Sequence, residues 1–545
     1  MLSDTQSTAI QQLIHSFESN NSPGMALGII HKGAFVFQQC VGLANLEDRI
    51  PITSHTVFEV GAMAKQFTAA CLALLIEQGK VDLEDNIAPF FPQMPNYGHT
   101  IQLQHLVYHT SGLPDYLELA HLKGLGNDAH YDSDFALKLV FSQPHLAFLP
   151  GEEERYCNTN YLLIGQIIQS ISGLGLRQFA AHHIFDPLKM HQTFFQDNAH
   201  EVIPNRAIGY SVSETQHSEV FPAGINVIGD GGLRTSLDDL LQWDQNFYQN
   251  KLGQQTESFN RLLLRPGSLN DGTRFDYGFG LILSDYCGMP TQRHGGVFAG
   301  FCAEMIRFPN AQLSIICLSN QANMTPWTLV EQVAAIVFDL EPKANSPRNN
   351  AWAVDLQPAT DLPEELLEQY VGYYDLGAAS PLEVIKKEGA LLLRYGAEEE
   401  LLIVPKTSQV FVEPSYNITI KFFNFDSKGA PFLLFKTPEQ EIIAAKVLPP
   451  NQTIGDLNHY QGNYYCASLK VVYCLFIEDN LLYLSIDFAP AIPLYFSEAD
   501  FAETGLGIIH FFRDNQNQVN GFWLNTEHIH HLEFKKLHQP QHSHE

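Results

Sequence analysis

The last third of the chain contains an internal repeat of about 90 residues, which constrains the fold more tightly than any other feature. The segment YVGYY at Tyr370 recurs as YQGNYY at Tyr460. Three more pairs follow in the same order: EVIKKEGALLLRY (383–395) with CLFIEDNLLYLSI (474–486), Phe411 with Phe501, and IKFFNFDSKGAPFLLF (420–435) with IIHFFRDNQNQVNGFWL (508–524). Coincidence among aromatic-rich strands is the alternative, and four similarities in one order argue against it. The repeat predicts two copies of a small antiparallel β-barrel.

The chain before the repeat mixes helices and strands. Two hairpins are predicted at 24–45 and 295–321, turning at Lys32-Gly33 and Pro309-Asn310. Since 545 residues exceed one ordinary domain, we expect several. The predicted division is an α+β domain at 1–340, a linker at 341–360, barrels at 361–448 and 449–537, and a tail at 538–545.

The charge and the cysteines exclude several classes of function. The formal net charge is −29, and it is spread along the chain, which argues against binding nucleic acid or anionic membrane surfaces. No segment approaches the roughly 18 apolar residues of a membrane span, and the N-terminus does not resemble a secretory signal. The eight cysteines have no metal-ligand spacing and are typical of a reducing compartment. We therefore predict a cytoplasmic protein without metal or cofactor, unless a leader precedes this sequence.

Ala62 and Lys65 lie three positions apart at the start of a predicted helix that ends before Gly79. Residues with this spacing share a helix face, so both should point into one cavity. A serine at position 62 would be a nucleophile beside a lysine that accepts its proton or holds a tyrosinate that does so. An ordinary helix with a solvated lysine is the alternative for this short motif taken alone.

A second candidate segment is LPGEEERYCNTNYLLIGQII (149–168), in which Tyr156 and Asn158 precede a predicted helix. Loops of this kind commonly present catalytic groups. A tyrosine beside an ammonium group can have a lowered pKa and act as a general base. The alternative is that Asn158 or Thr159 caps the helix, and the two interpretations are compatible.

A third candidate segment is Arg293-His294-Gly295-Gly296, directly before a predicted strand. Glycine at a strand edge lets another backbone or a substrate come close, and the next strand N–H could donate to an oxyanion. A single histidine is more often structural, so His294 gains weight only from the other two segments.

Taken together and in order, these segments resemble the serine β-lactamase and penicillin-recognising family. The resemblance covers residues 5–340 and is nearest to the class C-like esterases, D-aminopeptidases and DD-peptidases. It rests on FEVGAMAKQFTAA (58–70), HLVYHTSGLPDY (105–116), the 149–168 segment, GDGGLRTSLDDLLQW (229–243), YGFGL (277–281) and RHGGVFAGF (293–301). The two repeats resemble the domains that follow the catalytic domain in D-aminopeptidases. The resemblance implies an antiparallel sheet flanked by helices, followed by two lipocalin-like barrels.

The resemblance also implies roles for individual positions. These are the acyl-accepting serine position at Ala62, the motif lysine Lys65, the Y-x-N residues Tyr156 and Asn158, the H-x-G residues His294 and Gly296, and the oxyanion-hole N–H groups of Ala62 and Val297. Ser111 would be a conformational element and not the nucleophile. Cys157 would face away from the line of attack, so we do not expect it to replace the serine.

The implied activity is hydrolysis of a D-amino-acid amide, short peptide, ester or lactam through a covalent acyl-enzyme. Ala62 lacks the required hydroxyl, and loss of such a nucleophile costs on the order of 10⁶ in rate in another serine hydrolase. We therefore expect an inactive or strongly impaired protein, either a natural pseudoenzyme or an inactivated copy. A recent or engineered loss fits slightly better, because the other site residues are retained: Lys65, Tyr156, Asn158 and His294. A non-catalytic binding or regulatory protein that kept the pocket is the competing interpretation.

The barrels lack the residue patterns of a second active site, so a structural and access-limiting role is predicted for them. By similarity to D-aminopeptidases, FSEADFAETGLG (496–507) is the segment expected to lie near the site. That the barrels only support folding or assembly is the alternative. The expected partner is a small-molecule or peptide ligand, and homo-oligomerisation stays open.

Overall fold

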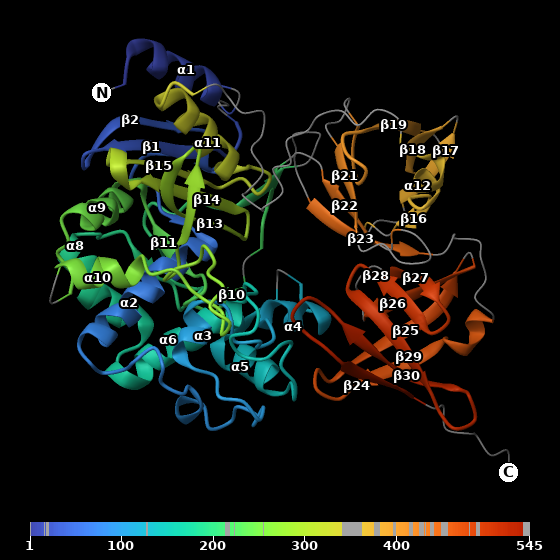
Figure 1. Ribbon diagram of the computed structural model, residues 1–545. Coiled ribbons are helices and arrows are strands. Elements are labelled where there is room, and N and C mark those ends of the chain that lie inside the picture. The colour runs from blue at the N-terminus through green and yellow to red at the C-terminus, as the bar shows by residue number, and fades with distance from the viewer. Residues whose placement is uncertain are drawn as a thin grey trace. The chain divides into compact units, whose positions relative to one another are not determined.

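The computed structural model divides the chain into two compact units (Figure 1). It describes residues 2–15, 17, 21–126, 129–212, 218–222, 224–253, 256–340, 362–374, 376, 382–387, 389–395, 399–413, 418–423, 430, 432–436, 441–447, 456–478, 480–486 and 491–537. The units are Met1–His121 with Leu125–Asn349, and Leu122–Gly124 with Asn350–Glu545. The predicted linker (341–360) and tail (538–545) lie outside the described residues.

A six-stranded antiparallel sheet forms the centre of the first unit. Its strand order is β12 (Ile282–Tyr286), β13 (Met289–Phe298), β14 (Phe301–Phe308), β15 (Leu313–Ser319), β1 (Met25–His31) and β2 (Ala34–Val41). Both predicted hairpins are confirmed. Lys32 and Gly33 have φ of 52° and 79°, as a two-residue hairpin turn of type I′ requires. The second turn is the short 3-10 helix η4 (Pro309–Ala311).

Helices cover both faces of this sheet (Figure 1). Helices α1 (Asp4–His15) and α11 (Pro326–Val337) bury Ile10, Ile14 and Val330 against one face. Helices α2 (Lys65–Glu77) and α9 (Leu237–Tyr248) belong to the larger core on the opposite face. Alternate residues of a strand point to opposite faces, so Leu27 and Ala26 of β1 join different cores.

The helical part of the first unit surrounds α2, which is buried on all sides from Lys65 to Leu75. Its helices are α3 (Leu103–Val107), α4 (Tyr116–Leu122), α5 (Ser133–Phe141), α6 (Asn158–Ser172), α7 (Leu176–Ala180), α8 (Asp186–Leu188) and α10 (Thr256–Leu263), with the short turns η2 (Ala88–Phe90) and η3 (Ala181–Phe185). Short strands connect them: β3 (Leu43–Asn45), β4 (Ile50–Pro51), β5 (Phe58–Glu59), β6 (Tyr131–Asp132), β7 (Phe194–Phe195), β8 (Tyr210–Val212), β9 (Ser218–Val220), β10 (Ile225–Asn226) and β11 (Leu233–Thr235). Among the described residues, no helix is long and apolar enough to cross a membrane.

The second unit contains two closed eight-stranded antiparallel barrels, which confirms the predicted architecture. Barrel 1 follows α12 (Glu364–Glu368) and consists of β16 (Gly372–Tyr374), β17 (Leu382–Lys387), β18 (Ala390–Tyr395), β19 (Glu399–Pro405), β20 (Val410–Glu413), β21 (Ile418–Phe423), β22 (Phe432–Lys436) and β23 (Glu441–Val447). Barrel 2 follows the turn η5 (Leu457–His459) and consists of β24 (Gly462–Cys466), β25 (Val471–Glu478), β26 (Leu481–Ile486), β27 (Ile492–Glu498), β28 (Phe501–Thr504), β29 (Gly507–Arg513), β30 (Val519–Asn525) and β31 (Leu532–Lys536).

The repeated Tyr-x-Gly segment closes each barrel in the same way. The Tyr464 hydroxyl donates to the Tyr460 carbonyl at 2.7 Å, and the Tyr374 hydroxyl donates to the Tyr370 carbonyl at 2.9 Å. Gly462 has φ of 138°, and a Cβ there would lie 2.9 Å from Cε of Lys536. The sequence similarity therefore reflects a shared closure between the first and last strands.

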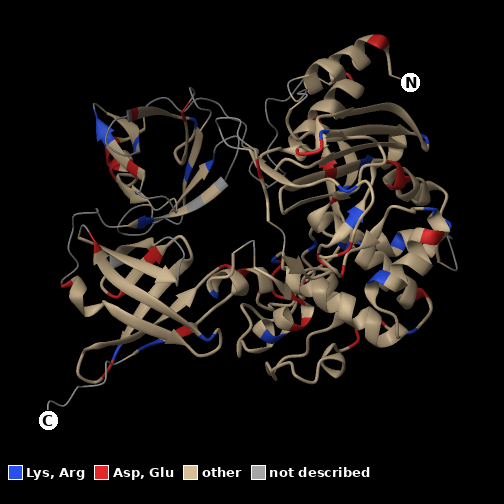
Figure 2. Cartoon of the chain, turned by 180° about the vertical axis from the view of Figure 1, so that it is seen from behind, with Lys and Arg blue, Asp and Glu red and all other residues tan. Residues whose placement is uncertain are grey.

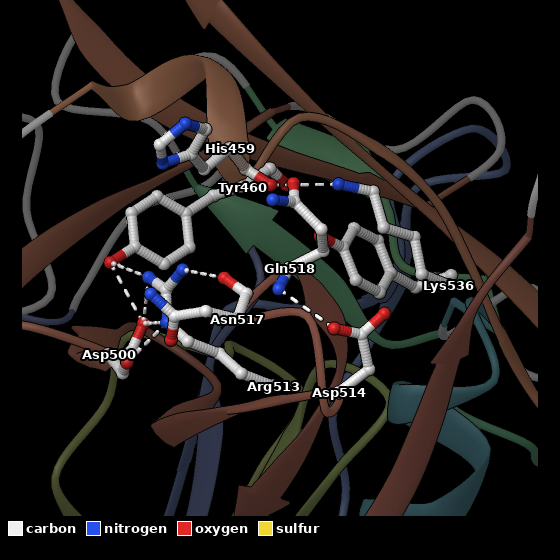
Figure 3. Close-up of polar contacts among 9 residues, drawn as sticks. His459, Tyr460, Asp500, Arg513, Asp514, Asn517, Gln518 and Lys536 are labelled. Carbon is white, nitrogen blue, oxygen red and sulfur yellow. Dashed lines mark hydrogen bonds and ion pairs between the residues drawn. The ribbon is translucent and has the colours of Figure 1, made fainter.

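Barrel 2 has an additional polar cluster (Figure 3). Arg513 binds the Asp500 carboxylate through Nε at 2.8 Å and Nη2 at 2.7 Å, and the Tyr460 hydroxyl donates to Asp500 at 2.9 Å. The positions 90 residues earlier, Val410 and Phe423, carry apolar side chains in barrel 1. The cluster is therefore specific to the second copy.

The segment 496–507, which the similarity suggested as a loop, consists largely of barrel wall. It includes the end of β27, all of β28 and the first residue of β29, joined by two short turns. Its predicted place near the candidate site stays a prediction. Asp, Glu, Lys and Arg residues are interspersed along the chain in both units (Figure 2).

Candidate active site

The turn around Ala62 lies directly against strand β13. Strand β5 leads into the 3-10 turn η1 (Gly61–Ala64), so the predicted α-helix begins at Lys65 and not at Ala62. An ideal Cβ on Gly296 would lie 2.1 Å from the Val60 carbonyl oxygen and 2.5 Å from the Ala62 nitrogen. A glycine is therefore required where the strand passes the turn.

Lys65 carries its ammonium group into the protein interior. It is fully buried, and its Nζ donates to Asn158 Oδ1 at 2.8 Å and to the Asp230 carbonyl at 2.9 Å. Asn158 is the first residue of α6 and so does not occupy the capping position. Its side chain binds Lys65 instead. The Thr159 hydroxyl donates to the Pro114 carbonyl at 2.7 Å. The capping interpretation is wrong for both residues.

Tyr156 lies beside this ammonium group, with its ring centroid 4.7 Å from Lys65 Nζ. About 38% of its surface is exposed. The His294 ring is 6.3 Å from the Tyr156 ring and is almost fully buried. His294 Nε2 is 3.2 Å from the Tyr277 hydroxyl, so this histidine belongs to an aromatic cluster with Tyr277 and Tyr156.

The pKa values of Lys65 and Tyr156 shift in opposite directions. Burial lowers the pKa of Lys65 to about 8, although the negative charges of Asp230 and Asp115 oppose this shift. Although part of the Tyr156 side chain is exposed, desolvation of its hydroxyl group and then the negative charge of Asp230 raise the pKa of Tyr156 well above its ordinary value. The pKa of Tyr156 is therefore not lowered, although its place beside an ammonium group allowed this, and Lys65 is the better proton acceptor near neutral pH.

A cavity of about 240 Å³ opens beside Ala62. Its lining residues include Ala62, Tyr156, Asn158 and Val297 of the predicted set. The other lining residues are Glu59, Gly61, Tyr116, Leu117, Gln196, Ala199, Arg206, Ile225, Asn226, Val227, Asp230, Gly231, Gly232, Arg234 and Phe298. Lys65, His294 and Gly296 were also expected to line this cavity, and they do not. Lys65 instead binds Asn158 from the interior, and the His294 ring lies 6.3 Å from the Tyr156 ring.

Sequence reasoning missed the acidic residues around Lys65. The Asn158 backbone N–H donates to Asp115 Oδ2 at 2.5 Å, and the Tyr116 hydroxyl donates to Asp230 Oδ2 at 2.8 Å. These residues occur in the segments 105–116 and 229–243, which were used for the resemblance without assigning a role to their carboxylates. Their position immediately beside glycine or proline turns was the available signal.

Ser111 and Cys157 are both buried, and neither side chain is suited to act as a nucleophile. Ser111 Oγ donates to Asn160 Oδ1 at 2.6 Å, which fits a conformational role. Cys157 Sγ is 3.4 Å from the Leu113 carbonyl oxygen, and burial raises the pKa of its thiol well above the ordinary value. Among the described residues, no group of three or more His, Cys, Asp or Glu side chains is placed to hold a metal ion.

Known proteins similar to this chain share most of its length. Residues 9–335 match the Beta-lactamase family. A D-aminopeptidase from Cereibacter sphaeroides is 30% identical over 470 residues, covering 85% of this chain and 84% of that protein. A penicillin-binding protein from Bacillus subtilis is 25% identical over 431 residues, covering 75% and 92%.

Solved structures support the fold. The octameric penicillin-binding protein homologue from Pyrococcus abyssi aligns with a TM-score of 0.56 at 20% identity, covering 81% of this chain and 99% of that one. At this level of identity the likeness concerns the fold alone, so the oligomeric state of the present chain stays open.

Proposed function

Because the chain belongs to the Beta-lactamase family, we propose that the cavity beside Ala62 is a serine-hydrolase acylation site that has lost its nucleophile. Its substrates would be D-amino-acid amides, short peptides, esters or lactams. D-aminopeptidases among the similar proteins support this substrate class. As it stands, the chain would bind such molecules without forming an acyl-enzyme.

One observation carries the proposal: the buried ammonium group of Lys65, held by Asn158 one turn from Ala62. A lysine with a pKa of about 8 can accept the proton of a hydroxyl at position 62. The tight packing of Gly296 against Ala62 supports an oxyanion hole from the N–H groups of residues 62 and 297. With serine at position 62, Oγ would attack the substrate carbonyl carbon while neutral Lys65 takes its proton. Lys65 would then give that proton to the amine or alcohol as the C–N or C–O bond breaks, which leaves the acyl group on the serine oxygen.

The second candidate is a binding or regulatory protein that uses the same cavity without catalysis. Ala62 itself favours it, because no hydroxyl is available at this position. Cys157 does not compensate, since its thiol is buried and its pKa is raised. If the first candidate is correct, a hydroxyl group at position 62 restores acylation. If the second is correct, it does not.

Labelling with a fluorescent penicillin and with a fluorophosphonate tests this difference, because both reagents need a nucleophile. We expect no labelling of the chain as given and clear labelling of Ala62→Ser at position 62. Ala199→Ser is the matched control, because it adds a hydroxyl to the same cavity at a position outside the Ala62–Lys65 turn. Absence of labelling in folded Ala62→Ser would favour the binding protein, and labelling of the original chain at Cys157 would overturn the site assignment.

A further inference from the structure

Two arginines and one glutamate lie together on one side of strand β5, which leads into the Ala62 turn. Glu59 belongs to β5 itself, and the arginines come from the segments that pair with this part of the chain on either side. Arg234 pairs with Glu59 across β11 and β5, and Arg206 pairs with Val57, two residues before Glu59. Residues two apart on a strand point to the same face, so Arg206, Glu59 and Arg234 lie together. All three line the cavity.

Arg234 is buried with hydrogen-bonding capacity that its neighbours do not use. It is 5% exposed, and its Nε lies 2.8 Å from Gln196 Oε1 and 3.1 Å from Glu59 Oε2. Its Nη1 has no hydrogen-bond partner among the described residues. A buried guanidinium nitrogen without a partner is costly, so Arg234 would gain from an acceptor that comes within reach of its guanidinium group.

Arg206 adds a second positive charge to the side of the cavity that Arg234 lines. Arg206 is exposed, and no hydrogen bond or ion pair of its side chain is found among the described residues. Burial lowers the pKa of Arg234, Glu59 opposes that shift, and the positive charge of Arg206 adds to it. Glu59 is the one acidic side chain of the trio, and burial raises its pKa. Arg234 is therefore paired with Glu59, whereas Arg206 adds a positive charge that no ion pair among the described residues offsets.

We propose that Arg206 and Arg234 form an anion subsite that binds a carboxylate group of the ligand. The proposal rests on the proposed use of the cavity and specifies the ligand: it carries a negative charge on the side that faces β5 and β11. Planar guanidinium groups match the geometry of a carboxylate and form charge-assisted hydrogen bonds with it. The cavity is large enough for a small aromatic or amino-acid ligand, since its volume is about 240 Å³.

The acidic residue Asp230 supports the opposite preference, for an ammonium group. It also lines the cavity, and its Oδ1 has no hydrogen-bond partner among the described residues. However, Lys65 already lies close to Asp230, and the Tyr116 hydroxyl donates to Oδ2 at 2.8 Å. A cation beside Asp230 would therefore face the positive charge of Lys65, which favours the anion.

The test uses three probes of nearly the same shape: benzoate, benzamide and benzylammonium. Their binding to the full chain with Ala62 is measured by isothermal titration calorimetry near pH 7 at low salt. We expect benzoate to bind about tenfold more tightly than benzamide, and benzylammonium to bind least tightly. Higher salt should reduce the benzoate preference, because part of it is electrostatic.

The variants change the exposed Arg206, so the test does not depend on whether the protein folds without the buried Arg234. Arg206→Gln should remove most of the preference for benzoate over benzamide, whereas Arg206→Lys should retain most of it. Arg261→Gln is the matched control, because Arg261 is exposed on α10 and does not line the cavity. Tightest binding of benzylammonium, no measurable binding of any probe, or an Arg206→Gln protein with the full preference would overturn the proposal.

The outcome is separable from that of the proposed function. The calorimetry needs no nucleophile, whereas the labelling of Ala62→Ser needs no carboxylate recognition by the arginines. Labelling without a benzoate preference would reject only the anion subsite. A benzoate preference without labelling would reject only the acylation site and leave an anion-binding cavity.

Discussion

At the scale of single residues, the burial of Lys65 sets the pH at which the site can accept a proton. Burial lowers the Lys65 pKa from 10.5 to about 8, and Asp230 and Asp115 keep it from falling further. The unfolded chain therefore binds the proton more tightly than the folded one. The neutral base becomes abundant as the pH rises through about 8, and the cost of burying the charge is relieved progressively between about 8 and the ordinary value of 10.5.

The acylation rate of Ala62→Ser should follow this ionisation. We expect the second-order rate constant for fluorophosphonate to rise with pH and to level off above about 8. Asp230→Asn removes a negative charge that supports the ammonium form, so the midpoint should move to lower pH. Asp82→Asn, an exposed change elsewhere in the unit, should leave the midpoint in place. A flat profile, or a midpoint that rises in Asp230→Asn, would show that Lys65 is not the base.

The motifs predicted which residues meet at the site better than they predicted their ionisation. Spacing within short segments indicated Lys65 and Asn158, and their side chains are 2.8 Å apart. The pKa of Tyr156 depends on burial and on Asp230, Tyr161 and Asp115, two of which come from distant segments. No local pattern reports such desolvation, so the sequence could not indicate that the pKa of Tyr156 is raised.

At the scale of elements, the close approach of β13 to η1 fixes the geometry of the site. Gly61 has φ of 49°, and a Cβ there would lie 2.9 Å from the Val297 nitrogen. Local turn chemistry predicted the hairpins on either side of this sheet. The pairing of β1 with β15 joins residues nearly 300 positions apart, and hydrophobic pattern alone does not specify such partners.

Gly296→Ala should disrupt this approach. The added methyl group would meet the backbone at Val60 and Ala62, which cannot move like a flexible side chain. We expect a loss of about 1–3 kcal/mol in the free energy of unfolding, and a loss of labelling in the Ala62→Ser background. Denaturant unfolding and labelling of the same samples measure both effects.

Gly175→Ala is the control for this change, because a Cβ at Gly175 meets no atom within 4 Å. It should change the free energy of unfolding far less than Gly296→Ala and leave labelling intact. Equal stability of the original chain and Gly296→Ala, with full labelling, would contradict the tight packing of β13 on η1.

At the scale of the whole molecule, the two barrels close in the same way, by a contact between their first and last strands. The last strand of each barrel supplies a lysine that crosses the glycine of the first: Lys536 Nζ donates to the His459 carbonyl at 2.8 Å, and Lys446 Nζ donates to the Gln369 carbonyl at 3.4 Å (Figure 3 shows the first). The repeat predicted two barrels because each copy must bury the same aromatic pattern. It did not predict the Asp500–Arg513 pair, since that pair has no counterpart in the first copy.

The two closures should be separable by mutation. Gly462 and Gly372 have φ of 138° and 152°, which only glycine adopts without strain, so alanine at either position should cost about 1–3 kcal/mol. Hydrogen exchange of the intact chain, resolved by peptide, should show faster exchange in β24 and β31 for Gly462→Ala, and in β16 and β23 for Gly372→Ala. Gly505→Ala is the control in barrel 2, because its nearest atom is 3.8 Å away and its φ is not in the strained range. If Gly462→Ala accelerated exchange equally in both barrels, they would unfold as one cooperative unit, and the repeated closure would not act locally.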